Sequence, residues 1–182
     1  MNNTIEITKE LLIGAADYVP LAVKEEWAAA NAPKCFDKLA ITADGESVPP
    51  MYMVNTGLKS RYLMAALASL YFHQDYEADE RDDALMSIAC YDKWAGGHAL
   101  NQIERWKREI EIRDKCFDLL ADFKDLEKRF AAQINSLLTV QNDSVIRQSE
   151  VNAMALKELP ALLEQLKDMQ GQAGKAEEEH GK

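Results

Sequence analysis

Residues 73–83 contain the densest group of side chains that could bind a metal ion. One histidine and six carboxylates fall in this stretch: His73, Asp75, Glu77, Asp79, Glu80, Asp82 and Asp83. Hard cations such as Ca²⁺ bind several oxygen ligands, and carboxylates at alternating positions open a calcium-binding loop. If the loop began at Asp75, Glu80 would stand where its sharp turn requires glycine, and Met86 where it requires a bidentate glutamate. We therefore interpret the stretch as a solvated acidic connector that caps the neighbouring helix.

Other motifs for metal binding or catalysis are missing from the sequence. A di-iron site in a helical bundle uses Glu-x-x-His pairs, but Leu70 precedes His73 by three residues and Ala95 precedes His98. The 3 cysteines are far apart and form no C-x-x-C pair. The glycine-rich loops that hold phosphates and the G-x-S-x-G motif of a nucleophilic serine do not occur. We therefore expect a protein that is not an enzyme and needs no cofactor.

The charge of the chain argues against nucleic acid as a partner. Its 182 residues include 21 basic and 31 acidic side chains, which give a formal net charge of −10. Proteins that bind DNA or RNA neutralise phosphates with Lys and Arg. The longest strongly apolar stretch, 63–72, is too short to span a membrane, and the amino terminus lacks the apolar core of a signal peptide. We therefore expect a cytoplasmic protein that binds neither nucleic acid nor membranes.

The composition favours a helical fold. Ala and Leu are abundant, whereas the chain has only 8 Gly and 5 Pro, so good helix formers outnumber helix breakers. We predict an all-α protein, an elongated bundle of roughly five to seven helices. Thr8 and either Asn55 or Thr56 are suited to cap two of these helices, and Pro20 is suited to begin another. Two adjacent glycines at 96–97 indicate a joint or a close approach of another backbone.

The clearest periodic pattern runs from about residue 98 to residue 141. Apolar residues recur there at intervals of three and four without Gly or Pro, which predicts one helix of about 40 residues and roughly 60 Å. A compact domain of this chain length is only about 35–40 Å across. The helix must therefore meet other long helices, from its own chain or from another. The aromatic residues of its stripe are typical of a core, but we predict that Trp106, Phe117 and Phe130 contact a partner.

Residues 34–56 form the least helical part of the sequence. Residues 39–42 and 51–54 favour strands, and Asp-Gly at 44–45 suits the turn of a β-hairpin. Pro-Pro at 49–50 favours the alternative, an irregular loop, because prolines disturb the hydrogen bonds of a ladder. We favour the loop, and in either case expect the segment to cover one end of the bundle.

The last part of the sequence predicts a break in the helix and then a tail. Asn-Asp-Ser at 142–144 suits a turn and a cap, and Pro160 predicts a kink or the start of another helix. Beyond residue 171 the chain is polar and acidic, with no large apolar residues to anchor it. We therefore predict one helical domain over 1–170 and a disordered acidic tail over 171–182.

Two hypotheses about function follow from these patterns. The leading one is a structural or assembly protein that acts by self-association, or by binding a protein partner, along the long helix. A homo-oligomer or a complex with another protein is then the expected state. The alternative is a helical protein that binds a small molecule or a divalent metal ion near the acidic connector, with His73, Asp75 and Glu77 as ligands.

Overall fold

The computed structural model describes residues 4–39, 42–43, 46–47, 51–74 and 92–179, and for 42–43, 46–47 and 161–179 it describes the backbone alone. The described part is mostly helical, as predicted, and η2 is a π-helical turn that continues α3. None of the described helices has both the length and the apolar character that crossing a membrane requires. In chain order the elements are α1 (Lys9–Gly14), α2 (Leu21–Asn31), η1 (Ala32–Cys35), β1 (Phe36–Leu39), β2 (Thr42–Ala43), β3 (Glu46–Ser47), β4 (Met51–Val54), α3 (Thr56–Ala66), η2 (Leu67–Tyr71), α5 (Ala99–Trp106) and α6 (Arg113–Glu179).

Three predicted helix starts are confirmed. The hydroxyl oxygen of Thr8 accepts a hydrogen bond from the backbone N–H of Leu11 at 3.3 Å, at the start of α1. The side-chain oxygen of Asn55 accepts one from the N–H of Leu58 at 2.9 Å, at the start of α3. Both bonds satisfy N–H groups that have no partner within the first helical turn. Pro20 directly precedes α2, where its fixed φ suits the beginning of a helix.

The segment near 34–56 forms paired strands, so the irregular loop that we favoured is wrong and the hairpin alternative is the better description. β1 pairs with β4, and β2 pairs with β3 in antiparallel orientation, with Thr42 opposite Ser47. The prolines at 49–50 lie between β3 and β4 in the sequence, so neither has to donate a hydrogen bond to a ladder. The predicted turn at 44–45 lies outside the described residues.

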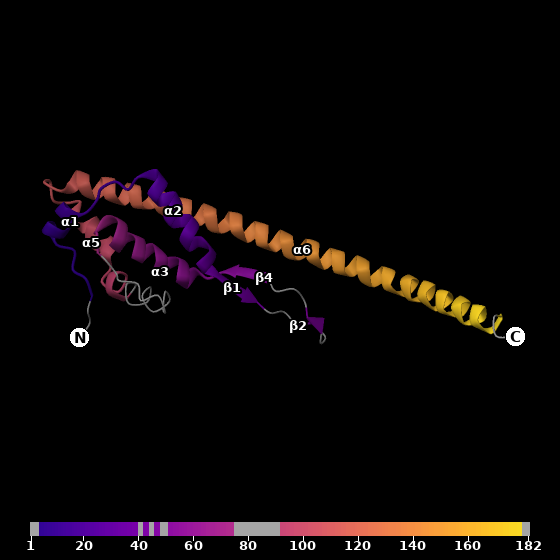
Figure 1. Ribbon diagram of the computed structural model, residues 1–182. Coiled ribbons are helices and arrows are strands. Elements are labelled where there is room, and N and C mark those ends of the chain that lie inside the picture. Colours follow the sequence, from indigo (N-terminus) through magenta and orange to yellow (C-terminus); the bar gives the residue numbers. More distant parts are fainter. Residues whose placement is uncertain (1–3, 40–41, 44–45, 48–50, 75–91, 180–182) are drawn as a thin grey trace. The chain divides into compact units, whose positions relative to one another are not determined.

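The chain forms two compact units. Unit 1 consists of residues 1–39 and 52–139, and unit 2 consists of residues 40–51 and 140–182. In unit 1, α2, α3 and α5 lie beside the first part of α6 (Figure 1). Helix α6 therefore supplies one wall of the unit 1 core. Among the largest fully buried side chains of this core are Leu12, Leu67, Tyr71, Trp94, Ile103, Leu119, Leu126, Phe130 and Ile134.

The single helix predicted over 98–141 is interrupted after Trp106, and it continues beyond its predicted end, although its predicted start agrees with that of α5 at Ala99. α5 ends at Trp106 and α6 begins at Arg113, and the chain turns between them. A turn-type hydrogen bond from the N–H of Ile112 to the carbonyl oxygen of Glu109, at 3.3 Å, helps to hold this turn. The apolar spacing continues across the turn because α5 and α6 both direct apolar side chains into the same core.

At its other end, α6 continues through the break predicted at 142–144. It extends to Glu179 and contains Pro160 in its interior. Asn, Asp and Ser favour caps, but inside a helix each costs only about 0.5–0.7 kcal/mol relative to Ala, so they do not have to end one. The helix also includes residues 171–179 of the segment for which we expected disorder. The single domain over 1–170 stays a prediction.

Candidate functional site

Phe130, one of the three predicted interaction residues, lies in the core of unit 1. Its side chain is fully buried, and its ring centroid lies 4.8 Å from that of Trp27. Because Trp27 belongs to α2, this aromatic pair ties α2 to α6. Phe130 therefore offers no surface to a partner in this fold.

Phe117 is the most exposed of the three predicted interaction residues. Its exposed fraction is 51%, and the ammonium group of Lys107 lies 4.5 Å from the centroid of its ring. This cation–π contact joins the turn after α5 to the first turns of α6. The rest of the ring remains open to solvent and is available for contact with another molecule.

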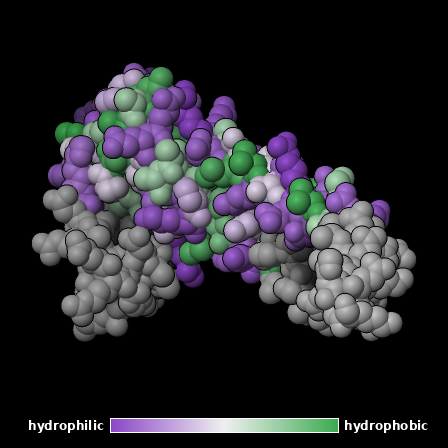
Figure 2. All heavy atoms as spheres, turned by 45° about the vertical axis from the view of Figure 1, so that its right-hand side comes forward, coloured by the Kyte–Doolittle hydropathy of each residue, from purple (hydrophilic) through white to green (hydrophobic). Residues whose placement is uncertain are grey.

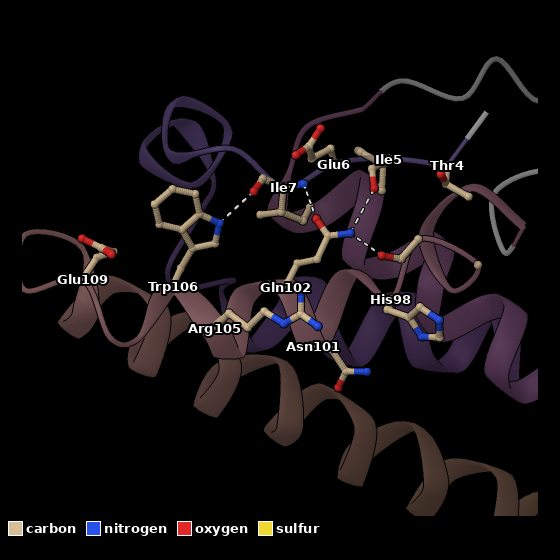
Figure 3. A pocket seen from close by; sticks show the side chains of 12 residues that line it. Thr4, Ile5, Glu6, Ile7, His98, Asn101, Gln102, Arg105, Trp106 and Glu109 are labelled. Atoms are coloured by element: carbon tan, nitrogen blue, oxygen red, sulfur yellow. Dashed lines mark hydrogen bonds between the residues drawn. The ribbon is translucent and has the colours of Figure 1, made fainter. Parts of the chain in front are cut away.

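Trp106 and Gln102, both on α5, hold the amino-terminal segment of the described chain. The indole N–H of Trp106 donates a hydrogen bond to the carbonyl oxygen of Ile7 at 2.8 Å. The amide oxygen of Gln102 accepts a hydrogen bond from the N–H of Ile7 at 2.5 Å. The amide nitrogen of Gln102 donates to the carbonyl oxygens of Ile5, at 3.2 Å, and of Gly97 (Figure 3). Trp106 is half-buried, and its hydrogen bond to Ile7 holds the amino-terminal segment in place within unit 1.

An open cleft of about 900 Å³ borders these hydrogen bonds. Asn101 and Arg105 line it from α5, and His98 lines it from the position directly before α5 (Figure 3); all three side chains are exposed. Glu6 and Glu109 also line the cleft, so it contains charges of both signs. A surface of this kind does not favour a ligand of one sign of charge, and the polar atoms of Gln102 already have partners inside the protein.

Gly97 marks a close approach of two backbone segments, as the paired glycines predicted. A Cβ atom at this position would lie 2.7 Å from the carbonyl oxygen of Ile5 and 2.9 Å from that of Lys93. Both are backbone atoms, and the N–H of Ile5 also donates a hydrogen bond to the carbonyl oxygen of Lys93 at 2.9 Å. Any side chain at Gly97 would therefore push the amino-terminal segment away.

Of the three residues proposed as metal ligands, the structure describes His73, while Asp75 and Glu77 lie outside the described residues. His73 follows η2 and has a φ of 49°, in the left-handed region that few residues other than glycine adopt. Within the described ranges, no three His, Cys, Asp or Glu side chains are placed to hold a metal ion together. The metal-binding alternative therefore gains no support from the described residues.

Two buried cysteine thiols are held in their unreactive form. Cys35 and Cys116 are buried and form no disulfide. Burial raises the pKa of the Cys35 thiol to about 11 and also raises that of Cys116, although Lys107 and Lys115 act in the opposite direction. Because the thiolate is the nucleophile, neither cysteine is activated for catalysis.

A buried cluster of charges that we did not predict joins α2, η2 and α6. The side chain of Lys24 is only 3% exposed, and its ammonium nitrogen lies 2.5 Å from Asp122 and 3.1 Å from Asp125. The other carboxylate oxygen of Asp122 accepts hydrogen bonds from the Tyr71 hydroxyl at 2.8 Å and from the N–H of Val19 at 3.0 Å. Asp122 thus has one cation and two neutral donors around it, as a buried charge requires.

The pKa shifts in this cluster show what it can do chemically. Burial lowers the pKa of Lys24, but the hydrogen bonds to Asp122 and Asp125 outweigh burial, so that the pKa is raised. Burial and the hydrogen bond to Asp122 raise the pKa of Tyr71. A protonated lysine is not a nucleophile, and a protonated tyrosine is not a base. The cluster therefore holds Lys24 and Tyr71 in their protonated forms and joins α2 and η2 to α6.

One sequence pattern indicates the residues that α6 contributes to this cluster. Asp122, Asp125 and Arg129 are spaced three and four residues apart, which places them on one face of a helix. In the structure the guanidinium of Arg129 lies 2.9 Å from Asp125 and 3.3 Å from Glu25 on α2. Sequence spacing alone does not indicate which helix supplies the opposing lysine, since Lys24 is distant in the chain.

Helix α6 divides into two segments that differ in burial. We call Arg113–Thr139, within unit 1, the packed segment and Val140–Leu159, within unit 2, the exposed segment. Every side chain from Ile146 to Leu159 is exposed. Figure 2 shows hydrophobic residues among hydrophilic ones over the described surface. Six large apolar side chains of the exposed segment are between 51% and 69% exposed: Val140, Ile146, Val151, Met154, Leu156 and Leu159.

Comparison with family models, curated proteins and solved structures finds no match for this chain. The geometry and chemistry of its own residues are therefore the basis for a functional proposal.

Proposed function

We propose that this chain is a non-enzymatic assembly protein that binds the helix of another protein molecule along the exposed segment of α6. The observation that carries the proposal is the set of six exposed large apolar side chains on this one stretch of helix. Exposed large apolar side chains that gather on one element are typical of sites that bind proteins. The proposed contact lies on α6 but almost entirely beyond the helix predicted over 98–141, and away from the aromatic residues that we predicted to contact a partner.

The energetics of the exposed segment also favour a partner helix. From Ile146 to Pro160 no side chain is buried, so the packing that stabilises most protein helices is missing there. Isolated helices shorter than about 12–15 residues are only marginally stable in water. Pro160 adds a cost because it has no N–H to donate to the carbonyl oxygen of Leu156. A second helix packed along this segment would supply the missing apolar contacts.

The charges of the exposed segment are consistent with a protein as the partner. Two basic residues, Arg147 and Lys157, stand among three acidic residues, Asp143, Glu150 and Glu158. A surface that binds nucleic acid needs an excess of cations. The balance instead resembles that of helix pairs, in which charges of both signs surround an apolar seam.

A photo-crosslinking amino acid placed at single positions of the full-length chain in living cells tests this proposal. At Val151 we expect a covalent adduct of higher mass, because this side chain lies on the apolar surface. Glu150 is the matched control, since it is the next residue and points about 100° away around the helix. Equal yields at the two positions, or no adduct at either, would overturn the proposal.

A further inference from the structure

The exposed segment of α6 follows the spacing of a two-stranded coiled coil. Positions 145, 148, 152, 155 and 159 alternate at intervals of three and four residues, and the sequence continues this register with leucine at 162 and 166 and methionine at 169. A repeat of 3.5 residues per turn is the pattern of helices that supercoil around each other. In heptad notation, the a positions are Val145, Asn152 and Leu159, and the d positions are Gln148 and Ala155.

Of the six exposed large apolar side chains, Leu159 lies on the seam and Val151 and Leu156 flank it, whereas the other three (Val140, Ile146 and Met154) lie at outer positions. Gln148, Asn152, Ala155 and Leu159 are all exposed, so no described part of the chain packs over the seam at these positions. Pro160 falls at a b position, on the outer side of such a pair, where its ring does not enter the seam. The proline that weakens an isolated helix is therefore compatible with a paired one.

Asn152 and the flanking residues favour a second copy of this chain as the occupant. A single Asn at an a position of a parallel dimer faces the same Asn of the other helix, and the two amides can hydrogen-bond to each other. An unrelated apolar helix would leave this amide without a partner, at a cost in affinity. The seam carries two amides, Gln148 and Asn152, and in a parallel pair in register each meets the same residue of the second copy.

The same residues favour a parallel over an antiparallel arrangement. Val151 is a g position and Leu156 an e position, and their exposed fractions are 61% and 69%. In a parallel pair in register, each g side chain meets the e side chain five residues later on the other helix, so Val151 meets Leu156. In an antiparallel pair, g meets g and e meets e, so this apolar contact is not formed.

We propose that two copies of this chain pair through the exposed segment of α6, parallel and in register, with Asn152 facing Asn152 and Val151 packed against Leu156 of the second copy. The inference rests on the proposed function and adds the identity and direction of the partner helix.

Disulfide trapping of purified full-length protein tests the arrangement. In a chain with Cys90→Ser, the remaining Cys35 and Cys116 are buried, so an introduced cysteine is the accessible thiol. Ala155→Cys places a thiol at a d position, where paired α-carbons lie about 6 Å apart, within reach of a disulfide. Glu150→Cys, on the outer face, is the matched control. We expect rapid formation of covalent dimer at 155 and not at 150, and a mass of two chains by sedimentation equilibrium without oxidant.

Each other outcome separates this inference from the proposed function. A mass of two chains with no preference for position 155 would contradict the parallel arrangement but leave helix pairing in place. A mass of one chain at every concentration would overturn pairing with a second copy. In that case, an in-cell adduct at Val151 with a protein of different mass would preserve the proposed function, and absence of the adduct would overturn both.

A substitution at Asn152 provides an independent test that does not need a new thiol. Asn152→Val makes the a position apolar, which in a parallel dimer removes the cost of burying two amides and tightens the dimer by about tenfold or more. Glu150→Val adds the same side chain on the outer face and should leave the dissociation constant unchanged. If Asn152→Val fails to tighten the dimer relative to Glu150→Val, the facing asparagines are contradicted.

Discussion

Within α6, the packed segment buries Cys116, Leu119, Leu126, Phe130 and Ile134 in unit 1, whereas the exposed segment buries no side chain from Ile146 to Leu159. The packed segment also carries Asp122, which shares a buried ion pair with α2. Both segments are helical, but the packed segment is stabilised by contacts within its own chain. The exposed segment has apolar side chains without such contacts, which is why we place the interaction there.

The comparison shows that hydrophobic periodicity alone does not distinguish a core from an interface. The packed segment has a strong stripe, and we had expected its residues Phe117 and Phe130 to meet a partner. The exposed segment has a weaker stripe that includes polar residues such as Asn152. A strong stripe is usually covered by its own chain, and a seam with polar positions is suited to a specific partner.

The largest effect is expected from Phe130→Ala in the packed segment. Removing this buried ring leaves a cavity beside Trp27 and should lower the free energy of unfolding by about 4 kcal/mol. Denaturant unfolding followed by tryptophan fluorescence measures it, because Trp27, Trp94 and Trp106 all lie in unit 1. If the variant instead kept its stability and changed only the assembly mass, Phe130 would be the interaction residue that the sequence predicted.

The buried ion pair should give the next largest effect. Lys24→Met leaves the Asp122 carboxylate buried without a cation, and should lower the free energy of unfolding by about 3 kcal/mol. Lys157→Met, in the exposed segment, removes the same group from an exposed position and should change stability by less than about 0.5 kcal/mol. Equal effects of the two substitutions, measured by urea denaturation, would show that Lys24 is not a structural charge.

The stability of unit 1 should depend on pH because of the buried thiol of Cys35. Burial raises the pKa of Cys35 from 9.0 to about 11, so between these pH values the unfolded chain loses a proton that the folded protein keeps. The free energy of unfolding therefore falls as the pH rises from 9 to 11, by roughly 2 kcal/mol at pH 11. Unfolding midpoints of the native chain and of Cys35→Ala, measured from pH 8 to 11, should diverge. Parallel curves would contradict the prediction.

The smallest effect on folding is expected at Leu156, the most exposed of the six large apolar side chains of the exposed segment. Leu156→Ala removes contacts that unit 1 does not make, so its tryptophan-detected stability should change by less than about 0.5 kcal/mol. The same substitution should weaken the dimer several-fold in sedimentation experiments, because Leu156 flanks the proposed seam. A loss of unit 1 stability comparable to that of Phe130→Ala would remove the distinction between the two segments.

Local sequence signals predicted the beginnings of elements better than their ends. Thr8, Pro20 and Asn55 act within one turn of chain, so the helix starts they specify could be recognised directly. The turn between Trp106 and Arg113 could not, because it contains neither Gly nor Pro and is held by bonds to distant parts of unit 1. Trp106 bonds to Ile7 there, and such a partner is invisible in the local sequence.

The candidate site was predicted only in part, for a similar reason. The length of the helix predicted over 98–141 led us to expect contacts beyond its own core, but most of this range lies within unit 1, and the fully exposed portion follows it. Which portion of α6 is covered depends on where α2 and η2 contact it. Lys24 and Tyr71 meet Asp122, and so fix the packed segment. These contacts join residues far apart in the chain, and no spacing rule reveals them. The exposed portion could be identified only after they were known.

Hydrogen exchange of full-length protein over a series of concentrations tests the central claim most directly, because it observes both segments of α6 in one sample. The packed segment should be protected at every concentration. We predict that protection of residues 146–159 appears only at concentrations where the mass of two chains is present, and is lost on dilution. Fast exchange of 146–159 at all concentrations, or protection that does not depend on concentration, would contradict the pairing of the exposed segment.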